Sequence, residues 1–343
     1  MASCTTQTSN TWYFADGYTV DGSVEQLIIT NPTADTVTVD LTFATKSGTR
    51  QPAAFQGDSI APHSVKVIPV ADSGLVDESI IGVQVVASRG RLIVGRAEHY
   101  VGGGRLGYTM SLGAPAPSDQ LWFADGEKGA GIVEQYVFFN PTDNDASVTP
   151  TVLGVATGSD FVPPEPFNVP AGKVVTFDMK DVAGVPDGPH TMVFATLSSP
   201  LVIGERVLTR PAGSGVATTV VMGMTSEYVV PRWYVPIGVD AAATGALVVY
   251  NVDATAAKVT VKAIGPGGEV AVPALQDLVL PASGLLPIDL SDPAVFGKPL
   301  VVESTTRVLV ERRLPRGNNL EGRSGSWALP ECGPCSFSSP PSS

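Results

Sequence analysis

The stretch that decides the fold is Thr11-Trp12-Tyr13-Phe14-Ala15-Asp16-Gly17, because it recurs along the chain. Related stretches are Leu121-Trp122-Phe123-Ala124-Asp125-Gly126 and Arg232-Trp233-Tyr234-Val235-Pro236-Ile237-Gly238, and Ser326-Trp327-Ala328-Leu329-Pro330 reads as a degenerate fourth copy. From Trp to Trp the steps are 122 − 12 = 110 and 233 − 122 = 111 residues. This period is too long for a solenoid repeat and matches one small domain. The sequence therefore predicts three copies of one module.

Each copy continues with the same order of strand signals. After the Trp stretch, an apolar run of strand length stops at Asn31, Asn140 or Asn251, the first two followed by Pro, which starts a turn. Near the end of each copy, two apolar runs are joined by a short turn such as Ser88-Arg89-Gly90, which predicts a hairpin.

Seven or eight short strands per copy are typical of an immunoglobulin-like β-sandwich. The predicted fold is thus all-β, with three tandem immunoglobulin-like sandwiches. The expected organisation is a polar tail at 1–9, sandwiches at 10–117, 118–230 and 231–331, and a Cys/Ser/Pro-rich tail at 332–343.

Composition excludes several classes of function. The formal net charge is −12, and the 21 Lys and Arg are scattered, which argues against nucleic acid as a partner. No run of 18 apolar residues is present, so no membrane span is expected. The start lacks the pattern of a signal peptide. With its polar start and its Ser/Pro-rich end, the chain is interpreted as a mature or excised piece of an extracellular or cell-envelope protein, with any signal or anchor outside it.

The repeated motifs resemble one family. Trp-Tyr-Phe-Ala-Asp-Gly, the strand ending in Asn-Pro and the closing Ile-Val-x-Glu-Arg strand are similar to an actinobacterial secreted or cell-envelope family of unknown function, whose tandem repeats open on Trp-Tyr-Phe-Ala-Glu-Gly. Asp16, Asp125 and Arg96 stand where that family has Glu, and Pro236-Ile237 departs further. The resemblance implies an extracytoplasmic β protein and supplies no activity, cofactor or catalytic residue.

The repeated Trp and Asn residues are interpreted as structural anchors: Trp12, Trp122, Trp233, Asn31, Asn140 and Asn251. The three Trp could instead be stacking platforms for a sugar, but flanking aromatic residues favour packing at a sandwich end or a domain junction.

Two acidic pairs are the strongest polar candidates. Asp16 with Glu25, and Asp125 with Glu134, lie nine residues apart. Such carboxylates could bind Ca²⁺ at a domain junction or act as acid and base in glycoside hydrolysis. The third copy lacks both, which favours a turn Asp and a surface Glu. The three His occupy different repeat positions. No catalytic, cofactor or metal site is therefore predicted.

Other polar pairs carry weaker signals. Cys332 and Cys335 form a C-x-x-C, read first as a small disulfide loop, with half a zinc site as the alternative. Glu205-Arg206 and Glu311-Arg312 are adjacent on predicted strands, so the members of each pair face opposite ways and are expected to pair with neighbouring strands.

Repetition without a repeated polar cluster favours a non-enzymatic structural or adhesive array of the cell envelope. The alternative is a protein that binds cell-wall glycan through exposed aromatic residues such as Tyr18, Tyr100 and Tyr108. Envelope proteins or glycan are the expected partners, with no cofactor.

Overall fold

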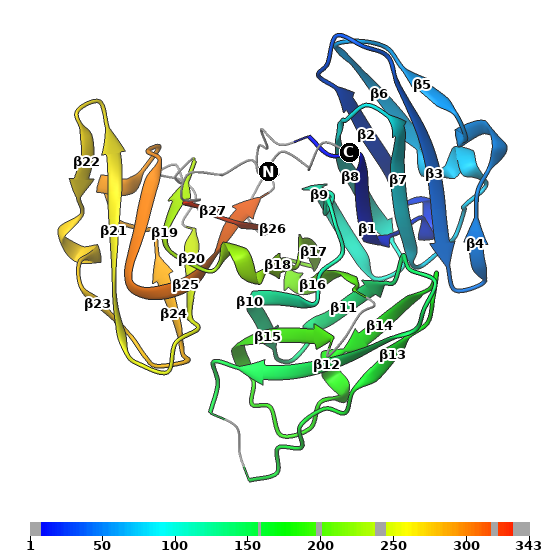
Figure 1. Cartoon of the computed structure of the whole chain (residues 1–343). Coiled ribbons are helices and arrows are strands. Elements are labelled where there is room, and N and C mark those ends of the chain that lie inside the picture. The colour runs from blue at the N-terminus through cyan, green and yellow to red at the C-terminus, as the bar shows by residue number, and fades with distance from the viewer. Residues whose placement is uncertain (1–7, 157–158, 197–200, 237–244, 317–321, 332–343) are drawn as a thin grey trace.

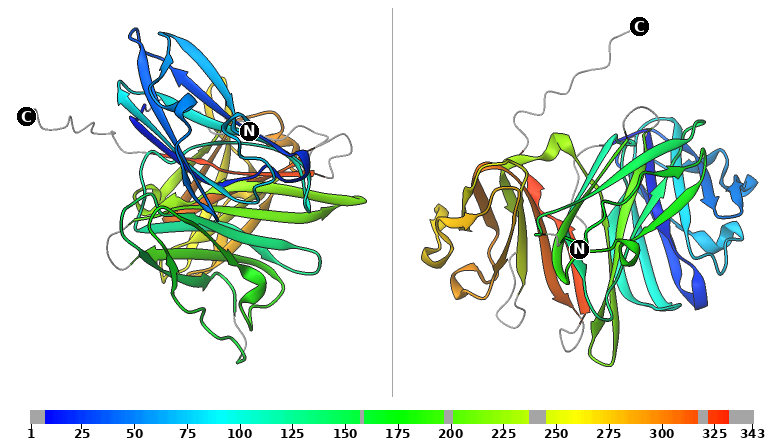
Figure 2. Two further views of the ribbon diagram at one scale, coloured as in Figure 1. Left: turned by 90° about the vertical axis from the view of Figure 1, so that its right-hand side faces the viewer. Right: turned by 90° about the horizontal axis from the view of Figure 1, so that it is seen from below.

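Strands connected by loops and single 3-10 turns form the whole of the described chain. The computed structural model describes residues 8–156, 159–196, 201–236, 245–316 and 322–331. The strands fall into three consecutive groups, here called unit 1 (β1–β9), unit 2 (β10–β18) and unit 3 (β19–β27), which lie side by side as three lobes (Figures 1 and 2). The all-β prediction is confirmed.

Each unit pairs a sheet that contains the Trp stretch, here called the Trp sheet, with a second sheet. In unit 1 the Trp sheet is β1 (Thr11–Gly17), β7 (Ile81–Arg89), β3 (Val37–Thr45) and β4 (Gly48–Arg50), with β5 (Asp58–Ile60) also on β3; the second sheet is β6 (Ser64–Pro69), β2 (Val24–Asn31), β8 (Ile93–Gly102) and β9 (Arg105–Leu112).

Unit 2 repeats this plan. Its Trp sheet is β13 (Phe167–Val169), β12 (Ala146–Leu153), β15 (Gly188–Thr196), β10 (Gln120–Lys128) and β18 (Met224–Thr225); its second sheet is β14 (Val174–Asp178), β11 (Val133–Phe139), β16 (Ile203–Ala212) and β17 (Gly215–Met222).

In unit 3 one long strand, β25 (Leu300–Arg316), serves both sheets. Its Trp sheet is β22 (Gly268–Ala271), β21 (Ala257–Gly265), β25, β19 (Val230–Val235) and β27 (Leu329–Pro330), with β23 (Leu278–Leu280) on β21; its second sheet is β24 (Leu285–Asp289), β20 (Ala246–Asn251), β25 and β26 (Gly322–Trp327). The 3-10 turns are η1 (Val20–Gly22), η2 (Ala53–Phe55), η3 (Val70–Ser73), η4 (Met179–Asp181), η5 (Ser226–Tyr228), η6 (Pro273–Leu275) and η7 (Pro293–Val295).

The predicted hairpin across Ser88-Arg89-Gly90 is wrong. β7 pairs with β1 and β3, whereas β8 pairs with β2 and β9, so the two strands lie in different sheets. The chain therefore turns a corner from one sheet into the other, and β25 makes the same corner without a break. In the sequence, two successive strands with inward-facing apolar residues look the same whether they pair as a hairpin or lie in different sheets.

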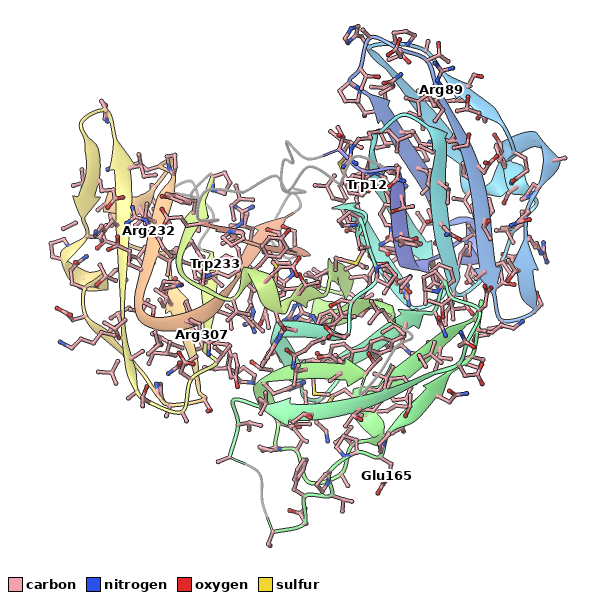
Figure 3. All side chains as sticks on the ribbon, viewed as in Figure 1. Trp12, Arg89, Glu165, Arg232, Trp233 and Arg307 are labelled. Atoms are coloured by element: carbon pink, nitrogen blue, oxygen red, sulfur yellow. The ribbon has the colours of Figure 1, made fainter. Side chains whose placement is uncertain are left out.

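Each unit has its own apolar core. Trp12 and Phe14 of the Trp sheet pack with Leu27 and Ile29 of the second sheet in unit 1. Separate clusters fill unit 2, around Phe123, and unit 3. Each unit therefore encloses an apolar interior between its sheets. Figure 3 shows Trp12 and Trp233 within separate lobes.

The three Trp are not equivalent, contrary to the expectation. Trp12 and Trp233 belong to the cores, with 3% and 0% of their surface exposed. Trp122 instead takes the position of Tyr13, because Trp12 pairs with Val85 and Leu121 pairs with Phe194 on matching strands. A slip of one residue reverses the face of a strand side chain. Trp122 therefore packs on the core cluster of unit 3, with its ring 6.0 Å from that of Tyr250.

Trp327 does not open a fourth unit. It ends β26, the partner of β25 in unit 3, and stacks on Trp233 with 6.5 Å between ring centres. Its indole N–H donates to the carbonyl of Met222 at 2.7 Å, across the boundary with unit 2. The degenerate copy is thus a strand end that joins two units.

Candidate functional site: buried charged joints between the units

The Trp strand of unit 1 carries a β-bulge where it meets unit 2. The register of β1 on β7 shifts between Phe14 and Gly17, which takes the intervening backbone out of the ladder. The freed N–H groups of Ala15 and Asp16 both donate to Glu205 Oε2 of β16, each at 2.8 Å. The Ala-Asp-Gly sequence therefore marks a docking bulge rather than a simple turn.

Glu205 also receives a guanidinium from unit 1. Arg96 of β8 donates to both Glu205 oxygens, at 3.1 and 2.7 Å, and to the carbonyl of Asp16 at 2.7 Å. Both side chains are fully buried, with 0% exposed. A buried bidentate pair restricts both the distance and the orientation of the two strands that carry it. We call this set of contacts joint 1.

Further charged groups surround joint 1. Asp16 binds Arg105 at 2.8 Å, and Glu98 lies 3.2 Å from Arg96 Nε and accepts from Tyr100 at 2.8 Å. Neither oxygen of Glu25 makes a well-formed hydrogen bond, although the N–H of Tyr18 and the charge of Arg96 are close enough to lower its pKa somewhat. Burial outweighs both, and raises the pKa of Glu25 to about 8. Burial likewise raises the pKa of Glu98 well above its usual range.

These raised pKa values predict a stability that falls as pH rises. A carboxyl whose pKa is higher in the folded state binds its proton more tightly there, so folding is favoured at low pH and loses this contribution between roughly pH 4.5 and 8. For Glu25 alone the free energy of unfolding should fall by up to about 1.4 kcal/mol per pH unit in that window. Urea unfolding at several pH values measures the slope.

The matched variant is Glu25→Gln, a neutral side chain of the same shape. It should flatten the pH dependence and raise stability at pH 8, whereas Glu227→Gln at an exposed turn should leave the profile unchanged. An identical slope in wild type and Glu25→Gln would show that Glu25 does not carry the proton.

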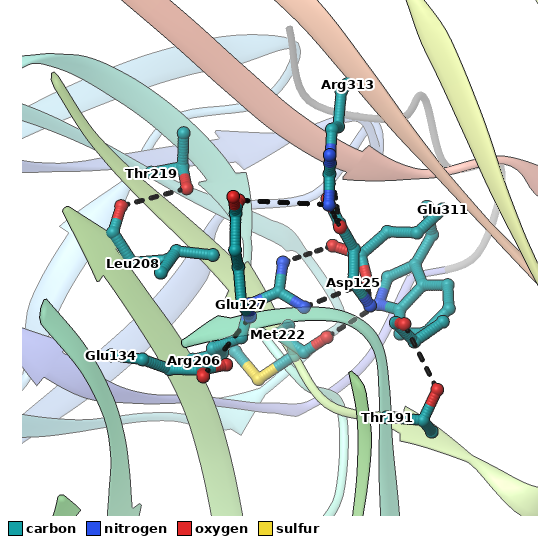
Figure 4. Close-up of polar contacts among 12 residues, drawn as sticks. Asp125, Glu127, Glu134, Thr191, Arg206, Leu208, Thr219, Met222, Glu311 and Arg313 are labelled. Carbon is teal, nitrogen blue, oxygen red and sulfur yellow. Dashed lines mark hydrogen bonds and ion pairs between the residues drawn. The ribbon is translucent and has the colours of Figure 1, made fainter. Parts of the chain in front are cut away.

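Joint 2, between units 2 and 3, repeats the chemistry one unit along (Figure 4). Arg206 binds both oxygens of Glu311, with Nη1 to Oε2 at 3.1 Å, and Glu311 Oε2 accepts from the N–H of Asp125 at 3.0 Å. The Asp125 carboxylate binds Arg313 of unit 3, with Nε at 2.7 Å from each oxygen. Glu205 and Arg206 are neighbours on β16, so their opposite directions connect unit 2 to both other units.

Behind joint 2 lies a buried pair that joint 1 lacks. Glu134 accepts from Tyr136 at 2.6 Å and lies 2.9 Å from Nε2 of His190, which is completely buried. A Cβ on Gly126 would come within 2.6 Å of that nitrogen, so glycine at this position makes room for the pair. Close packing therefore requires the glycine of this Asp-Gly pair.

The groups that would form a joint before unit 1 or after unit 3 are missing from the second sheet of unit 1 and from the Trp stretch of unit 3. Gly95, Glu205 and Glu311 are equivalent, because they pair with Ile28, Val137 and Val248, each three residues before the strand's Asn. Unit 1 therefore has no carboxylate at the position that receives a preceding unit. In unit 3, Pro236 replaces Ala15 and has no N–H to donate.

Apolar contacts reinforce joint 1. Tyr13 and Ala15 of unit 1 pack on the outer face of the second sheet of unit 2, against Val137, Phe139 and Val207. β17 also contacts both β9 and β26, so the three last hairpins meet near the centre of the arrangement (Figure 1).

The repeated Asn residues perform one local task in all three units. Each is completely buried, and its amide donates to the carbonyl four residues on and to at least one carbonyl about 30 residues on. The side-chain oxygen accepts from the N–H two residues on, at 3.0 or 3.1 Å. Asn31, Asn140 and Asn251 thus hold a loop against the end of a strand.

Several expected positions differ in the structure. Glu25 and Glu134 were expected at the surface but are buried, because the bulge and the facing unit cover them. Tyr18 and Tyr100 were expected as exposed loop aromatics but are 4% and 1% exposed; Tyr108 is 60% exposed. Cys332 and Cys335 lie outside the described residues. The acidic pairs do lie at unit junctions, but beside guanidinium groups, which repel a cation.

Among the described residues, no group of three or more His, Cys, Asp or Glu is placed to hold a metal ion. Over the same residues, no helix has the length and apolarity to cross a membrane. A surface hollow of about 250 Å³ lies beside Trp12, Arg91 and Tyr228, and a second of about 310 Å³ lies where Thr42 and Gln84 of unit 1 approach Asp143 of unit 2.

The family comparison gives one match, to a family without assigned chemistry. The model of one family of unknown function matches residues 1–96 and 111–319. The chain belongs to DUF5719. No relative of this DUF5719 chain was found among curated proteins.

Two solved structures are weakly similar to the DUF5719 chain. Thermotoga maritima 1070 is 17% identical with a TM-score of 0.27, over 31% of this chain and 93% of that one. A Streptomyces avermitilis α-L-rhamnosidase complexed with L-rhamnose is 10% identical with a TM-score of 0.16, over 88% of this chain and 42% of that one. The DUF5719 chain therefore spans less than half the length of the rhamnosidase.

Proposed function

We propose that the protein is a non-enzymatic structural or adhesive array of the cell envelope, in which three immunoglobulin-like sandwiches are held at fixed positions. One observation supports this most directly: Arg96, Glu205, Arg206 and Glu311 are buried between units and bind one another across the unit boundaries. These charged groups connect domains instead of facing a hollow where a substrate could reach them.

Fixed units present several faces with constant spacing. Weak contacts made by linked copies add through effective concentration, provided that the geometry lets them engage together. Two antiparallel sheets around one core in about 100 residues support the immunoglobulin-like part of the proposal, while the corner between β7 and β8 sets these units apart. An actinobacterial origin and a place outside the cytoplasm rest on the resemblance of the Trp motifs.

Carbohydrate binding is the second candidate, and the hollow beside Trp12 favours it. Arg91 and Tyr228 line this hollow, and an aromatic ring beside a hydrogen-bond donor suits a sugar. The leading proposal predicts that the chain shows no saturable binding to immobilised cell-wall glycans up to about 1 mM, whereas immobilised envelope proteins bind it.

A glycan array with matched variants separates the two candidates. Saturable binding that Tyr228→Ala or Tyr108→Ala removes, and that Val279→Ala at an exposed position of unit 3 retains, would replace the leading proposal by glycan binding. Turnover of a glycoside or an ester that Glu25→Gln abolishes would instead establish an enzyme.

A further inference from the structure

The outer face of the second sheet of unit 1 is apolar and largely exposed, although its β9 edge lies beside β17 of unit 2. Seven of the twelve most exposed large apolar side chains among the described residues lie on its four strands: Val24, Val65, Val67, Val101, Leu106, Tyr108 and Met110. Strand pairing places these positions on one face, because Val24 lies opposite His99, His99 opposite Tyr108 and Val101 opposite Leu106. On β6, Val65 and Val67 pair with Thr30 and Ile28 of the same face.

This face is the equivalent of a face that is buried elsewhere in the molecule. In unit 2 the matching positions, which include Val137, Phe139, Val207 and Val220, pack under unit 1. The second sheet of unit 3 receives unit 2 through contacts of β10 with β20 and β25. The same sheet face therefore accepts another sheet twice in this chain, and unit 1 offers it a third time. Apolar patches of this extent on a protein surface mark interaction sites.

The chemistry of the face selects the occupant. Arg96, Glu98 and Arg105 point to the inner side, so no Asp, Glu, Lys or Arg points outward from these strands. A face without charged side chains cannot form ion pairs with a charged partner, whereas it can pack against an identical apolar face.

Head-to-tail growth is disfavoured at both ends. Unit 1 has Gly95 where a joint needs Glu, and the outer side of the Trp sheet of unit 3 carries a charged network of Arg232, Glu303 and Lys262. Figure 3 shows Arg232 on the lobe of unit 3, far from Trp12 in unit 1.

We propose that this face binds the same face of a second copy of the chain, which forms a two-fold dimer by sheet-on-sheet packing. An interface that uses one patch on both partners closes on itself and cannot extend into a fibre. Packed sheets lie about 10 Å apart, so the side chains of β6, β2, β8 and β9 interdigitate with those of the partner. Tyr108 and Met110 supply the large aromatic and thioether groups that are enriched at such interfaces.

Light scattering coupled to size exclusion tests the dimer, using the whole chain from about 1 to about 100 μM. The expected mass is twice the 35.5 kDa of one chain. The double variant Val67→Glu with Tyr108→Glu should raise the dissociation constant at least roughly 30-fold, because two charges would be buried without partners. The control Val279→Glu changes a valine that is 69% exposed in unit 3 and should leave the mass unchanged.

Circular dichroism identifies variants that fail to fold, and hydrogen exchange provides a second readout. Amides of β6 and β9 should exchange more slowly in the wild type at high concentration than in the double variant. A monomeric wild type over the whole range would overturn the proposal, whether a tail of the chain or an unlike partner covers the face. A mass that grows without limit, or a dimer that the double variant leaves intact, would overturn it as well.

Discussion

Replacing Glu205 by alanine is expected to lower the free energy of unfolding by about 3–5 kcal/mol, the usual cost of leaving a buried partner charge unpaired. The change leaves Arg96 buried without its carboxylate and removes the acceptor of the Ala15 and Asp16 N–H groups. Urea unfolding followed by tryptophan fluorescence measures the change.

A surface carboxylate provides the control for this variant. Glu303 binds Arg232 and Lys262 but is 29% exposed, so Glu303→Ala should cost no more than about 1 kcal/mol. A double-mutant cycle of Arg96→Met with Glu205→Ala should give a coupling energy of at least about 2 kcal/mol. Equal small effects at Glu205 and Glu303 would show that joint 1 is not a determinant of stability.

Replacing Trp233 by alanine is expected to cost about 3–5 kcal/mol through loss of apolar burial and creation of a cavity. Its ring is completely buried, and its indole N–H donates to the carbonyls of Val230 and Val308 at 3.0 and 3.1 Å. Trp122 is half-buried between units 2 and 3, so Trp122→Ala should cost less.

Chemical denaturation of the two variants separates the roles of these residues. If both variants lose the same free energy of unfolding, the register slip that moves Trp122 out of the core of unit 2 does not reduce its contribution to stability. If Trp233→Ala leaves stability unchanged, the ring is not a core residue and the sugar-platform interpretation returns.

The local elements could be predicted because their signals are local. Alternating residues such as Val37, Val39 and Leu41 fix a strand and its inward face, and the Asn that ends each apolar run binds atoms of its own unit. The recurrence of the Trp stretch likewise predicted three groups of strands with separate cores.

The joints could not be predicted, because each depends on residues that lie between 105 and 190 positions apart. Glu205 acquires its role from a bulge in β1 and a guanidinium on β8, and the sequence does not show that these groups meet across a unit boundary. The Glu-Arg dipeptides held the available signal, since adjacent strand residues face opposite ways. Comparing Gly95 with Glu205 and Glu311 would have shown that units 2 and 3 carry the carboxylate at a position where unit 1 has glycine.

The slip at Trp122 shows why the most conspicuous residue is a poor guide to register. Counting from Asp16 to Asp125 gives 125 − 16 = 109, one fewer than the step between the first two Trp. The bulge fixes the position of the Asp, so units 1 and 2 are aligned correctly by their Asp-Gly pairs. In that alignment Leu121, and not Trp122, takes the core position of Trp12.

The central claim is that buried pairs join the three units into one cooperative body, and scanning calorimetry of the whole chain tests it most directly. We predict a single transition whose van't Hoff enthalpy equals the calorimetric enthalpy. Separate transitions, or a van't Hoff enthalpy near one third of the calorimetric value, would show that the units unfold independently and would contradict the claim.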